Sequence, residues 1–135
     1  MISEHTAQSM VFSWASWHVG KHPELKLLFA VPNAGKRSIG AAAYLRAEGL
    51  RSGVPDIVLP VPRAGYGGLY IEMKTIKGKV SDKQADWILS LSAAGNCVKV
   101  CRSYEEAIEV ITEYLRLPKD SHTDILDQSF TPRER

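Results

Sequence analysis

The sequence predicts a single α/β domain in which a small mixed β-sheet is flanked by helices. Segments with helical periodicity alternate with short β-branched runs along most of the chain, and turn residues separate them. The chain has 135 residues, of which 44% are hydrophobic and 24% are charged. That length and composition allow one buried core and leave no room for two domains.

The first expected element is a helix over residues 4–17. Ser3 is a suitable N-cap, and Glu4 in the first turn complements the helix dipole. Apolar residues recur on one side at helical spacing and form the expected buried face: Met10, Val11, Trp14 and Trp17. The two tryptophans are better explained as core or dimer contacts than as a platform for stacking bases.

The next expected elements are short. Residues 25–31 form an apolar run that fits either a strand or a buried turn, and a turn follows at 32–35. The Ala-rich segment 38–48 predicts a helix, and Gly49 follows it at a position where helices favour glycine. After a further turn, the β-branched run 57–59 predicts a brief strand.

A loop rich in glycine and proline then leads into a strand expected over residues 69–74. Side chains alternate between the two faces of a strand. Ile71 and Met73 are therefore expected to face one way. Glu72 and Lys74 are expected to face the other way.

The boundaries in the second half of the chain are clearer. Ser81 and Gln84 have the spacing of a capping box, which predicts the start of a helix, and Gly95 predicts its end. The apolar residues expected to pack from this helix are Trp87, Ile88 and Leu91. A strand is expected over residues 97–101.

A final helix is expected after a second capping box, formed by Ser103 and Glu106, and Pro118 closes it. The residues that it is expected to bury are Ala107, Ile108, Ile111 and Leu115. Residues 119–135 lack periodicity, and we expect them to form a flexible tail. The folded domain is thus expected to span residues 1–118.

Positive charge is concentrated in the middle of the chain. The whole sequence carries 17 Lys and Arg against 15 Asp and Glu, for a net charge of +2. Residues 21–83 alone carry eleven basic against five acidic residues, a net charge of +6. This excess suggests a face that binds an anion, although chance clustering on a solvated surface remains an equal alternative.

Composition excludes several classes of protein. Cys97 and Cys101 are too few for a disulfide framework or a four-cysteine zinc site. The longest apolar runs are too short to cross a membrane, and the first residues lack the apolar region of a secretion signal. We therefore expect a soluble protein of the cytoplasm.

Three residues suggest chemistry on a phosphate ester. Glu72 and Lys74 lie two positions apart, so on a strand their Cα atoms are about 6.6 Å apart on the same face. Asp56 begins another expected strand, and two converging carboxylates suit Mg²⁺ or Mn²⁺. A nearby lysine can orient or deprotonate water or stabilise charge on phosphate. The pattern favours phosphodiester hydrolysis, although an isolated Glu-x-Lys on a strand is more often an exposed ion pair.

Three successive motifs make the sequence recognisable. They are Gly-Val-Pro-Asp-Ile at 53–57, Tyr-Ile-Glu-Met-Lys at 70–74 and Val-Ser-Asp-Lys-Gln-Ala-Asp-Trp-Ile at 80–88. In this order and spacing they resemble the VRR-NUC family, the virus-type replication-repair nuclease branch of the PD-(D/E)xK superfamily. The resemblance runs over most of residues 1–116 and is strongest to the stand-alone phage and bacterial members. It implies a restriction-endonuclease-like core and makes residues 1–118 the nuclease domain.

The resemblance also implies a metal centre and a set of catalytic residues. The implied ligands of Mg²⁺ or Mn²⁺ are Glu4, Asp56, Glu72 and the backbone carbonyl of Met73. The implied catalytic residues are Glu4, Asp56, Glu72, Lys74 and Gln84, with Lys74 as the catalytic lysine. On the residues alone, Glu4 can equally be an acid that serves the helix dipole, and Gln84 can be the capping partner of Ser81.

Basic residues outside the motifs are candidates for contacts with DNA: Lys36, Arg37, Lys77, Lys79 and Lys83. The first two follow a turn whose amides could bind a backbone phosphate, and the other three follow the catalytic strand. An ordinary solvated surface is the alternative for all five.

The sequence leaves two functional hypotheses. The leading one is a Mg²⁺- or Mn²⁺-dependent deoxyribonuclease, and the resemblance implies a homodimer that cuts four-way junctions or other branched DNA. The alternative is a non-catalytic nucleic-acid-binding domain on the same scaffold. Acidic residues on a surface that faces DNA weaken phosphate binding unless a cation bridges them, which favours the enzyme.

Overall fold

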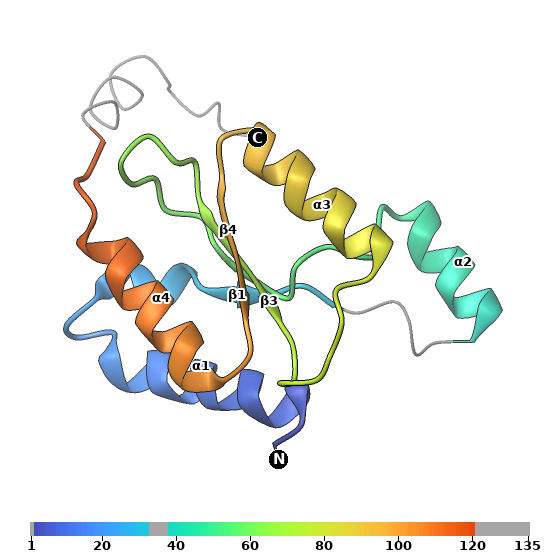
Figure 1. Cartoon of the computed structure of the whole chain (residues 1–135), viewed down its shortest axis with the longest axis horizontal. Helices are drawn as coiled ribbons and strands as arrows, with labels where there is room; N and C mark the ends of the chain where they lie inside the picture. The colour runs from blue at the N-terminus through green and yellow to red at the C-terminus, as the bar shows by residue number, and fades with distance from the viewer. Residues whose placement is uncertain (1, 33–37, 121–135) are drawn as a thin grey trace, which may run out of the picture.

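The computed structural model describes residues 2–32 and 38–120. Its elements, in chain order, are the helix α1 (Glu4–His18), the 3₁₀ helix η1 (Pro23–Leu27), the strand β1 (Phe29–Ala30), the helix α2 (Ile39–Ala47), the strands β2 (Ile57–Leu59) and β3 (Leu69–Met73), the helix α3 (Asp82–Ala93), the strand β4 (Cys97–Cys101) and the helix α4 (Tyr104–Arg116). The expected α/β class with a small sheet between helices is confirmed (Figure 1).

The sheet is mixed. Its order is β1-β2-β3-β4, in which β1–β2 and β2–β3 are antiparallel and β3–β4 is parallel. The parallel pair requires a crossover, which α3 supplies between β3 and β4. Strand β3 therefore lies inside the sheet with a partner on each side, and it carries the Glu-Met-Lys motif to the end of the sheet.

Helices cover the sheet unevenly. Helices α1 and α4 pack against each other and contact β3, while α3 packs against β4 (Figure 1). The alternation along β3 is confirmed, because Ile71 and Met73 join the core beneath α1 and α4 whereas Glu72 bonds to Gln84 of α3. Helix α2 stands away from the rest in Figure 1 and buries only Ala42.

The buried face of α1 differs from the expected one. Its buried residues are Ala7, Val11 and Ala15, which follow one another at intervals of four. Of the expected set, only Val11 is buried; Trp14 is half-buried and stacks on His18. The expectation was wrong for Met10, which is 36% exposed, and for Trp17, which is 83% exposed. Small residues on the inner face let α1 approach the sheet and α4 closely.

Burial in the two later helices also differs from the expectation. Trp87, Ile88 and Leu91 are only half-buried, and no residue of α3 is fully buried. Helix α4 buries Ala107 and Ile111 as expected. It also buries Tyr114, whereas the expected Ile108 and Leu115 are only half-buried. The Tyr114 hydroxyl donates to the carbonyl of Val61 at 2.7 Å, which satisfies its polar group inside the core.

The helix starts follow the predicted caps in two of three cases. Ser3 accepts from the amide of Thr6, and Ser81 with Gln84 forms a complete capping box. Ser103 accepts from the amide of Glu106, but the Glu106 carboxylate accepts from the amide of Arg102, not from that of Ser103. The second capping box is therefore only half formed.

Two remaining expectations concern chain segments. The apolar run 25–31 is neither one strand nor one turn, because it divides between η1 and β1. Of the expected tail 119–135, only two residues are described, and Asp120 accepts a hydrogen bond from the amide of Gly65 at 2.8 Å; residues 121–135 lie outside the described chain. No helix in the described ranges is both long and apolar enough to cross a membrane.

Candidate active site

Asp56 is fixed where two strands meet. It directly precedes β2, and its backbone carbonyl accepts from the amide of Val31 at 2.8 Å. Its Oδ2 atom accepts from the amide of Met73 at the end of β3, also at 2.8 Å. The carboxylate is therefore held beside β3, next to the residue that follows Glu72.

Glu72 is the most unusual side chain of the molecule. It is 2% exposed, although an isolated charged carboxylate is costly to bury. Its Oε2 atom accepts from the side-chain amide of Gln84 at 3.3 Å. Its Oε1 atom is buried and has no hydrogen-bond partner among the described residues. A buried carboxylate oxygen without a partner is typical of a position that a cation or water occupies.

The electrostatics of Glu72 follow from this burial. Its pKa is raised to about 8, first because burial disfavours the charged form and then because the Asp56 carboxylate repels that charge and would accept a hydrogen bond from the protonated form. The charge of Glu4 raises the pKa further, whereas the ammonium group of Lys74 lowers it. The protein thus gathers acidic groups here that its own cations compensate only in part, so that Glu72 keeps its proton up to a pH of about 8.

Lys74 lies beside Glu72 on the continuation of β3. Its Nζ atom is 4.0 Å from Glu72 Oε2, and its side chain is 12% exposed. Its backbone amide donates to the carbonyl of Cys101 at 2.9 Å, which extends the pairing with β4 by one residue. Gly78 lies against its aliphatic chain, since a Cβ atom there would be 3.5 Å from Lys74 Cδ. The ammonium group is therefore held next to the carboxylates.

Gln84 caps α3 as expected and also contacts the buried carboxylate. Its Oε1 atom accepts from the amide of Ser81 at 2.9 Å, which completes the capping box of α3. Its Nε2 atom donates to Glu72. Capping thus fixes the side chain so that its amide points at the buried carboxylate.

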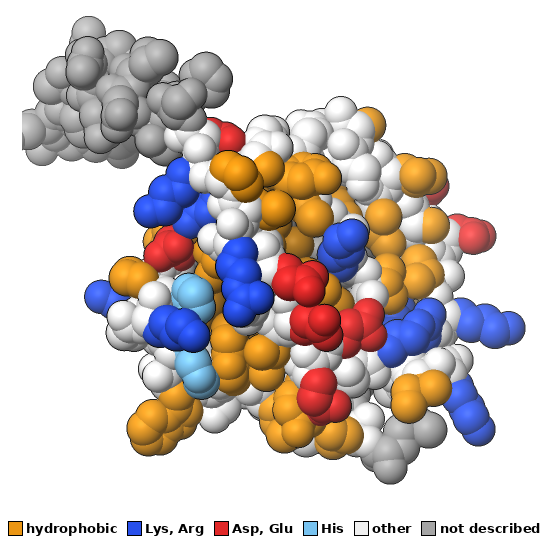
Figure 2. Space-filling view, turned by 60° about the vertical axis from the view of Figure 1, so that its left-hand side comes forward, with side chains coloured by type: hydrophobic (Ala, Val, Ile, Leu, Met, Phe, Trp, Pro, Cys, Tyr) orange, Lys and Arg blue, Asp and Glu red, His pale blue; other side chains and the backbone are white. Residues whose placement is uncertain are grey.

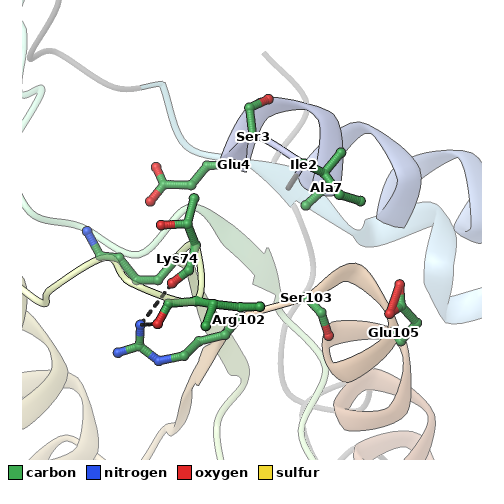
Figure 3. A pocket seen from close by; sticks show the side chains of 10 residues that line it. Ile2, Ser3, Glu4, Ala7, Lys74, Arg102, Ser103 and Glu105 are labelled. Atoms are coloured by element: carbon green, nitrogen blue, oxygen red, sulfur yellow. Dashed lines mark hydrogen bonds between the residues drawn. The ribbon is translucent and has the colours of Figure 1, made fainter.

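Glu4 lies across an open cavity from these residues. It is exposed in the first turn of α1, and it lines a cavity of about 640 Å³ together with Asp56 and Thr75. A second cavity, of about 200 Å³, is lined by Glu4, Lys74 and Arg102 among others. Figure 3 shows the Glu4 carboxylate and the Lys74 side chain extending toward the same side of this second cavity.

The donors fit a hard divalent cation, although they do not form a complete cage. Within residues 2–32 and 38–120, no group of three or more His, Cys, Asp or Glu side chains is close enough to hold a metal ion. Glu4 is thus near the Asp56–Glu72 pair without joining it. A Mg²⁺ site commonly uses one or two carboxylates and completes its coordination with water and substrate phosphate. The unpartnered Glu72 Oε1 and the neighbouring Asp56 carboxylate match that requirement.

The predicted DNA contacts divide between described and undescribed residues. Lys77, Lys79 and Lys83 are exposed between the end of β3 and the first turn of α3. Lys36 and Arg37 lie outside the described residues. The outer side of α4 has the opposite charge, since it exposes Glu105, Glu106, Glu109 and Glu113. Figure 2, with the α4 side brought forward, shows a compact group of acidic side chains there.

Two residues that support the site were not identified from the sequence. Arg102 donates from Nη1 to the carbonyls of Thr75 at 2.9 Å, Ile76 at 3.4 Å and Gly78 at 2.6 Å, and so holds the loop after Lys74 (Figure 3). No local pattern distinguishes this arginine from the other basic residues.

Gly53 is the second. It has a φ of +89°, and a Cβ atom there would lie 2.8 Å from the backbone carbon of Lys83. Glycine permits both this conformation and this contact. The Gly-Val-Pro-Asp turn signalled the conformation, but the contact with the start of α3 depends on the tertiary fold.

Comparison with known proteins is consistent with this arrangement. A family model described as the VRR-NUC domain matches residues 8–105. A solved structure described as a VRR_NUC domain protein has a TM-score of 0.74 and 25% sequence identity, and the match covers 88% of this chain and 93% of that chain. No curated protein matches the chain. The motifs, the fold and the family model agree, and the chain therefore belongs to the VRR-NUC family of nuclease-type domains.

Proposed function

We propose that this protein is a Mg²⁺- or Mn²⁺-dependent endonuclease that hydrolyses the phosphodiester bonds of DNA. The observation that carries the proposal is the buried Glu72 carboxylate, which has an unpartnered Oε1, the Asp56 carboxylate beside it and the Lys74 ammonium group 4.0 Å away. Stability alone gives no reason to bury such a group, because replacing a buried charge by a neutral residue is often stabilising. A requirement for a cation explains it.

Each residue of the site has a proposed role. Asp56 and Glu72 would hold the cation, with Glu4 and the backbone carbonyl of Met73 as further ligands. When bound, the cation would neutralise the carboxylates and draw charge from the phosphate oxygens. Gln84 keeps the Glu72 side chain in place through its hydrogen bond at 3.3 Å.

Lys74 would act on the reacting groups directly. Its ammonium group lies beside the carboxylates, where it can orient the attacking water or stabilise the negative charge that develops on the phosphate. The oxygen of that water forms a bond to phosphorus while the bond from phosphorus to one sugar oxygen breaks. The water gives up a proton to solvent and the leaving sugar oxygen takes one from solvent, so the products are a phosphate end and a hydroxyl end. Lys77, Lys79 and Lys83, with Lys36 and Arg37, would bind the DNA backbone around the cut.

The substrate and assembly belong to the same proposal. We expect branched DNA, such as four-way junctions, to be preferred and the active form to be a homodimer, as the resemblance implies. Two symmetry-related sites can cut two strands of one branched substrate. We expect the enzyme to act in the cytoplasm, which is that of the host if the chain is phage-encoded.

Cleavage of labelled DNA tests the enzymatic activity. The purified protein is incubated with a four-way junction, a flap and a plain duplex in Mg²⁺, Mn²⁺ or EDTA. We expect cutting in either metal, none in EDTA, and a loss of at least about 100-fold in Lys74→Ala, as is usual when a group that acts in the transition state is removed. Lys119→Ala is the matched control, because Lys119 is an exposed lysine that lines a different cavity.

The outcomes separate the proposal from its alternative. Metal-dependent cutting that survives in Lys119→Ala and is lost in Lys74→Ala supports the nuclease, and the ranking of substrates tests the preference for branches. The alternative is the non-catalytic nucleic-acid-binding domain. It is favoured by one observation: among the described side chains, no third carboxylate is close enough to complete a metal site. Binding without cutting of any substrate, together with tighter binding by Glu72→Gln, would support that alternative.

A further inference from the structure

A small polar cavity adjoins the candidate active site on the side of α3. Its volume is about 40 Å³, and its lining includes the site residues Asp56 and Gln84. Arg51, from the segment that joins α2 to β2, lines the same cavity. Neither the family motifs nor the site described above includes this arginine.

The guanidinium group of Arg51 is oriented but not neutralised. Its Nη1 atom donates to the carbonyl of Arg46 at 3.2 Å and to that of Leu50 at 3.3 Å. Both acceptors are uncharged, and no carboxylate in the described part of the chain lies within ion-pair distance of it. The side chain is exposed, so Nε and Nη2 can reach a ligand from solvent.

The backbone around Arg51 is fixed relative to the site. Gly53 packs against the backbone of Lys83 at the start of α3, and Pro55 is fully buried. The carbonyl of Asp56 accepts a hydrogen bond from Val31 at 2.8 Å. Arg51 is thus separated from Asp56 by a short segment that is anchored at three points, and it has little freedom to move away.

The charge around the cavity indicates what Arg51 binds. Glu4 and Asp56 repel a phosphate, and so does Glu72 when it is ionised; within the motifs, the cations that oppose them are Lys74 and the exposed Lys83. A phosphodiester chain that reaches the carboxylates needs cations on more than one side. Arginine presents several donors in a planar fork that matches phosphate oxygens, and an arginine without an acidic partner keeps its charge for them.

We propose that Arg51 binds a phosphate of the DNA backbone next to the phosphate that is cleaved. The inference rests on the proposed function, because it takes DNA as the substrate of the neighbouring site. The hydrogen bonds of Arg51 also satisfy the carbonyl of Arg46, in the last turn of α2, and that of Leu50 in the segment after it. A purely structural role for Arg51 would stop there.

Binding in EDTA tests the assignment without cleavage. The affinity of the full chain for a fluorescent four-way junction is measured between about 50 and 200 mM salt, for wild type, Arg51→Ala, Arg51→Lys and Arg46→Ala. Arg46 is the matched control, because it is an exposed arginine of α2 that does not line the cavity. Loss of one phosphate contact lowers the slope of log K against log[salt] by about one, and the affinity by about tenfold.

The expected result is this loss in Arg51→Ala, at least half of the slope restored in Arg51→Lys, and a change of less than about twofold in Arg46→Ala. Equal effects of the two alanine variants would show that the affinity depends on overall positive charge and not on a contact made by Arg51, and would overturn the proposal. An unchanged slope in Arg51→Ala, or no recovery of the slope in Arg51→Lys, would also overturn it. If wild type shows the Arg51-dependent slope but cuts no DNA in metal, the proposed function fails while the contact between Arg51 and a backbone phosphate stands. If wild type cuts DNA in metal but its slope does not depend on Arg51, the assignment of Arg51 alone is refuted.

Discussion

At the scale of single residues, Glu72 has an arrangement that is poor for stability. It is buried, one of its oxygens lacks a partner, and its neighbour Asp56 has the same sign of charge. Its folded-state pKa of about 8 lies well above the usual value of 4.5. The unfolded chain therefore releases this proton more readily than the folded one, and the metal-free fold loses stability as the pH rises from about 4.5 to about 8.

The variant Glu72→Gln is therefore expected to be more stable than wild type at high pH and to lack cleavage. In EDTA at pH 9 its Tm should exceed that of wild type by roughly 5 °C, because the amide has no charge to bury. At pH 5 the two Tm values should nearly agree, since wild-type Glu72 is then protonated. Thermal melting at both pH values measures the difference.

The control for this variant is Glu109→Gln, which neutralises an exposed glutamate of α4. It should leave the pH dependence of the Tm close to that of wild type. If Glu72→Gln has the same pH dependence as wild type, or is less stable at pH 9, then burial of the Glu72 charge does not destabilise the fold.

At the scale of elements, the loop after β3 depends on one side chain from the end of β4. Arg102 donates to the carbonyls of Thr75, Ile76 and Gly78. Thr75 and Ile76 follow Lys74 directly, and Gly78 lies between the exposed Lys77 and Lys79. Hydrogen bonds from a charged group each contribute about 1.5–3 kcal/mol. Removing the guanidinium group should therefore free the loop while the sheet stays folded.

We expect Arg102→Ala to be cut by trypsin after Lys77 or Lys79 several-fold faster than wild type under native conditions. Local opening controls such cleavage when the rest of the fold is intact. Mass spectrometry of the first fragments gives the site and rate. Arg116→Ala, at the exposed end of α4, is the control. Equal rates in the two variants would mean that Arg102 does not hold the loop.

The elements themselves were largely predictable from local signals. Ser3 and Ser81 cap helices as their spacing indicates, and the strands at 57–59 and 97–101 have the bounds that the sequence predicts. These features are decided within a few residues of the chain. Local periodicity and hydrogen-bonding capacity are therefore enough to place them.

Which face of a helix is buried was less predictable. In α1, the large apolar residues Met10 and Trp17 suggested one face, but the neighbouring elements pack on the stripe of Ala7, Val11 and Ala15. Side-chain size alone does not indicate how closely another helix approaches. Besides the adjacent η1, the contact partners of α1 are β3 and α4, which lie far along the chain, and no local pattern contains them.

The residues of the site also divide into those that local sequence indicates and those that depend on the tertiary fold. The motifs indicated Asp56, Glu72 and Gln84, and the fold does bring these side chains together. The contributions of Arg51, Arg102 and Gly53 could not be read from the sequence, because each depends on a contact with a distant segment or on a cavity. Glu4 is near the pair but not part of it, and its role as a ligand stays a prediction.

At the scale of the whole molecule, the candidate site and a second group of charged residues lie at opposite ends of the sheet. The start of α1, the end of β3 and the start of α3 all meet around Lys74 and the carboxylates. The opposite end of the sheet begins at Leu59, which pairs with Leu69. There Glu24 forms an ion pair with Arg63 at 2.8 Å, and Lys119 lines a separate cavity.

This separation predicts that the position of a charge matters more for DNA binding than the net charge of the molecule. Lys79→Glu and Lys119→Glu each lower the net charge of +2 by two units. Lys79 follows the strand that carries the site, whereas Lys119 lies at the far end of the sheet. We expect Lys79→Glu to weaken binding to a DNA junction by at least about tenfold at moderate salt, since it would replace the proposed phosphate contact by a repulsion. Lys119→Glu should change the affinity by less than about threefold, because exposed charges more than a Debye length of about 8–10 Å from the DNA are largely screened.

Fluorescence anisotropy in EDTA gives both values. Equal losses in the two variants would mean that the overall charge draws the protein to DNA, and that the end of β3 is not its binding face.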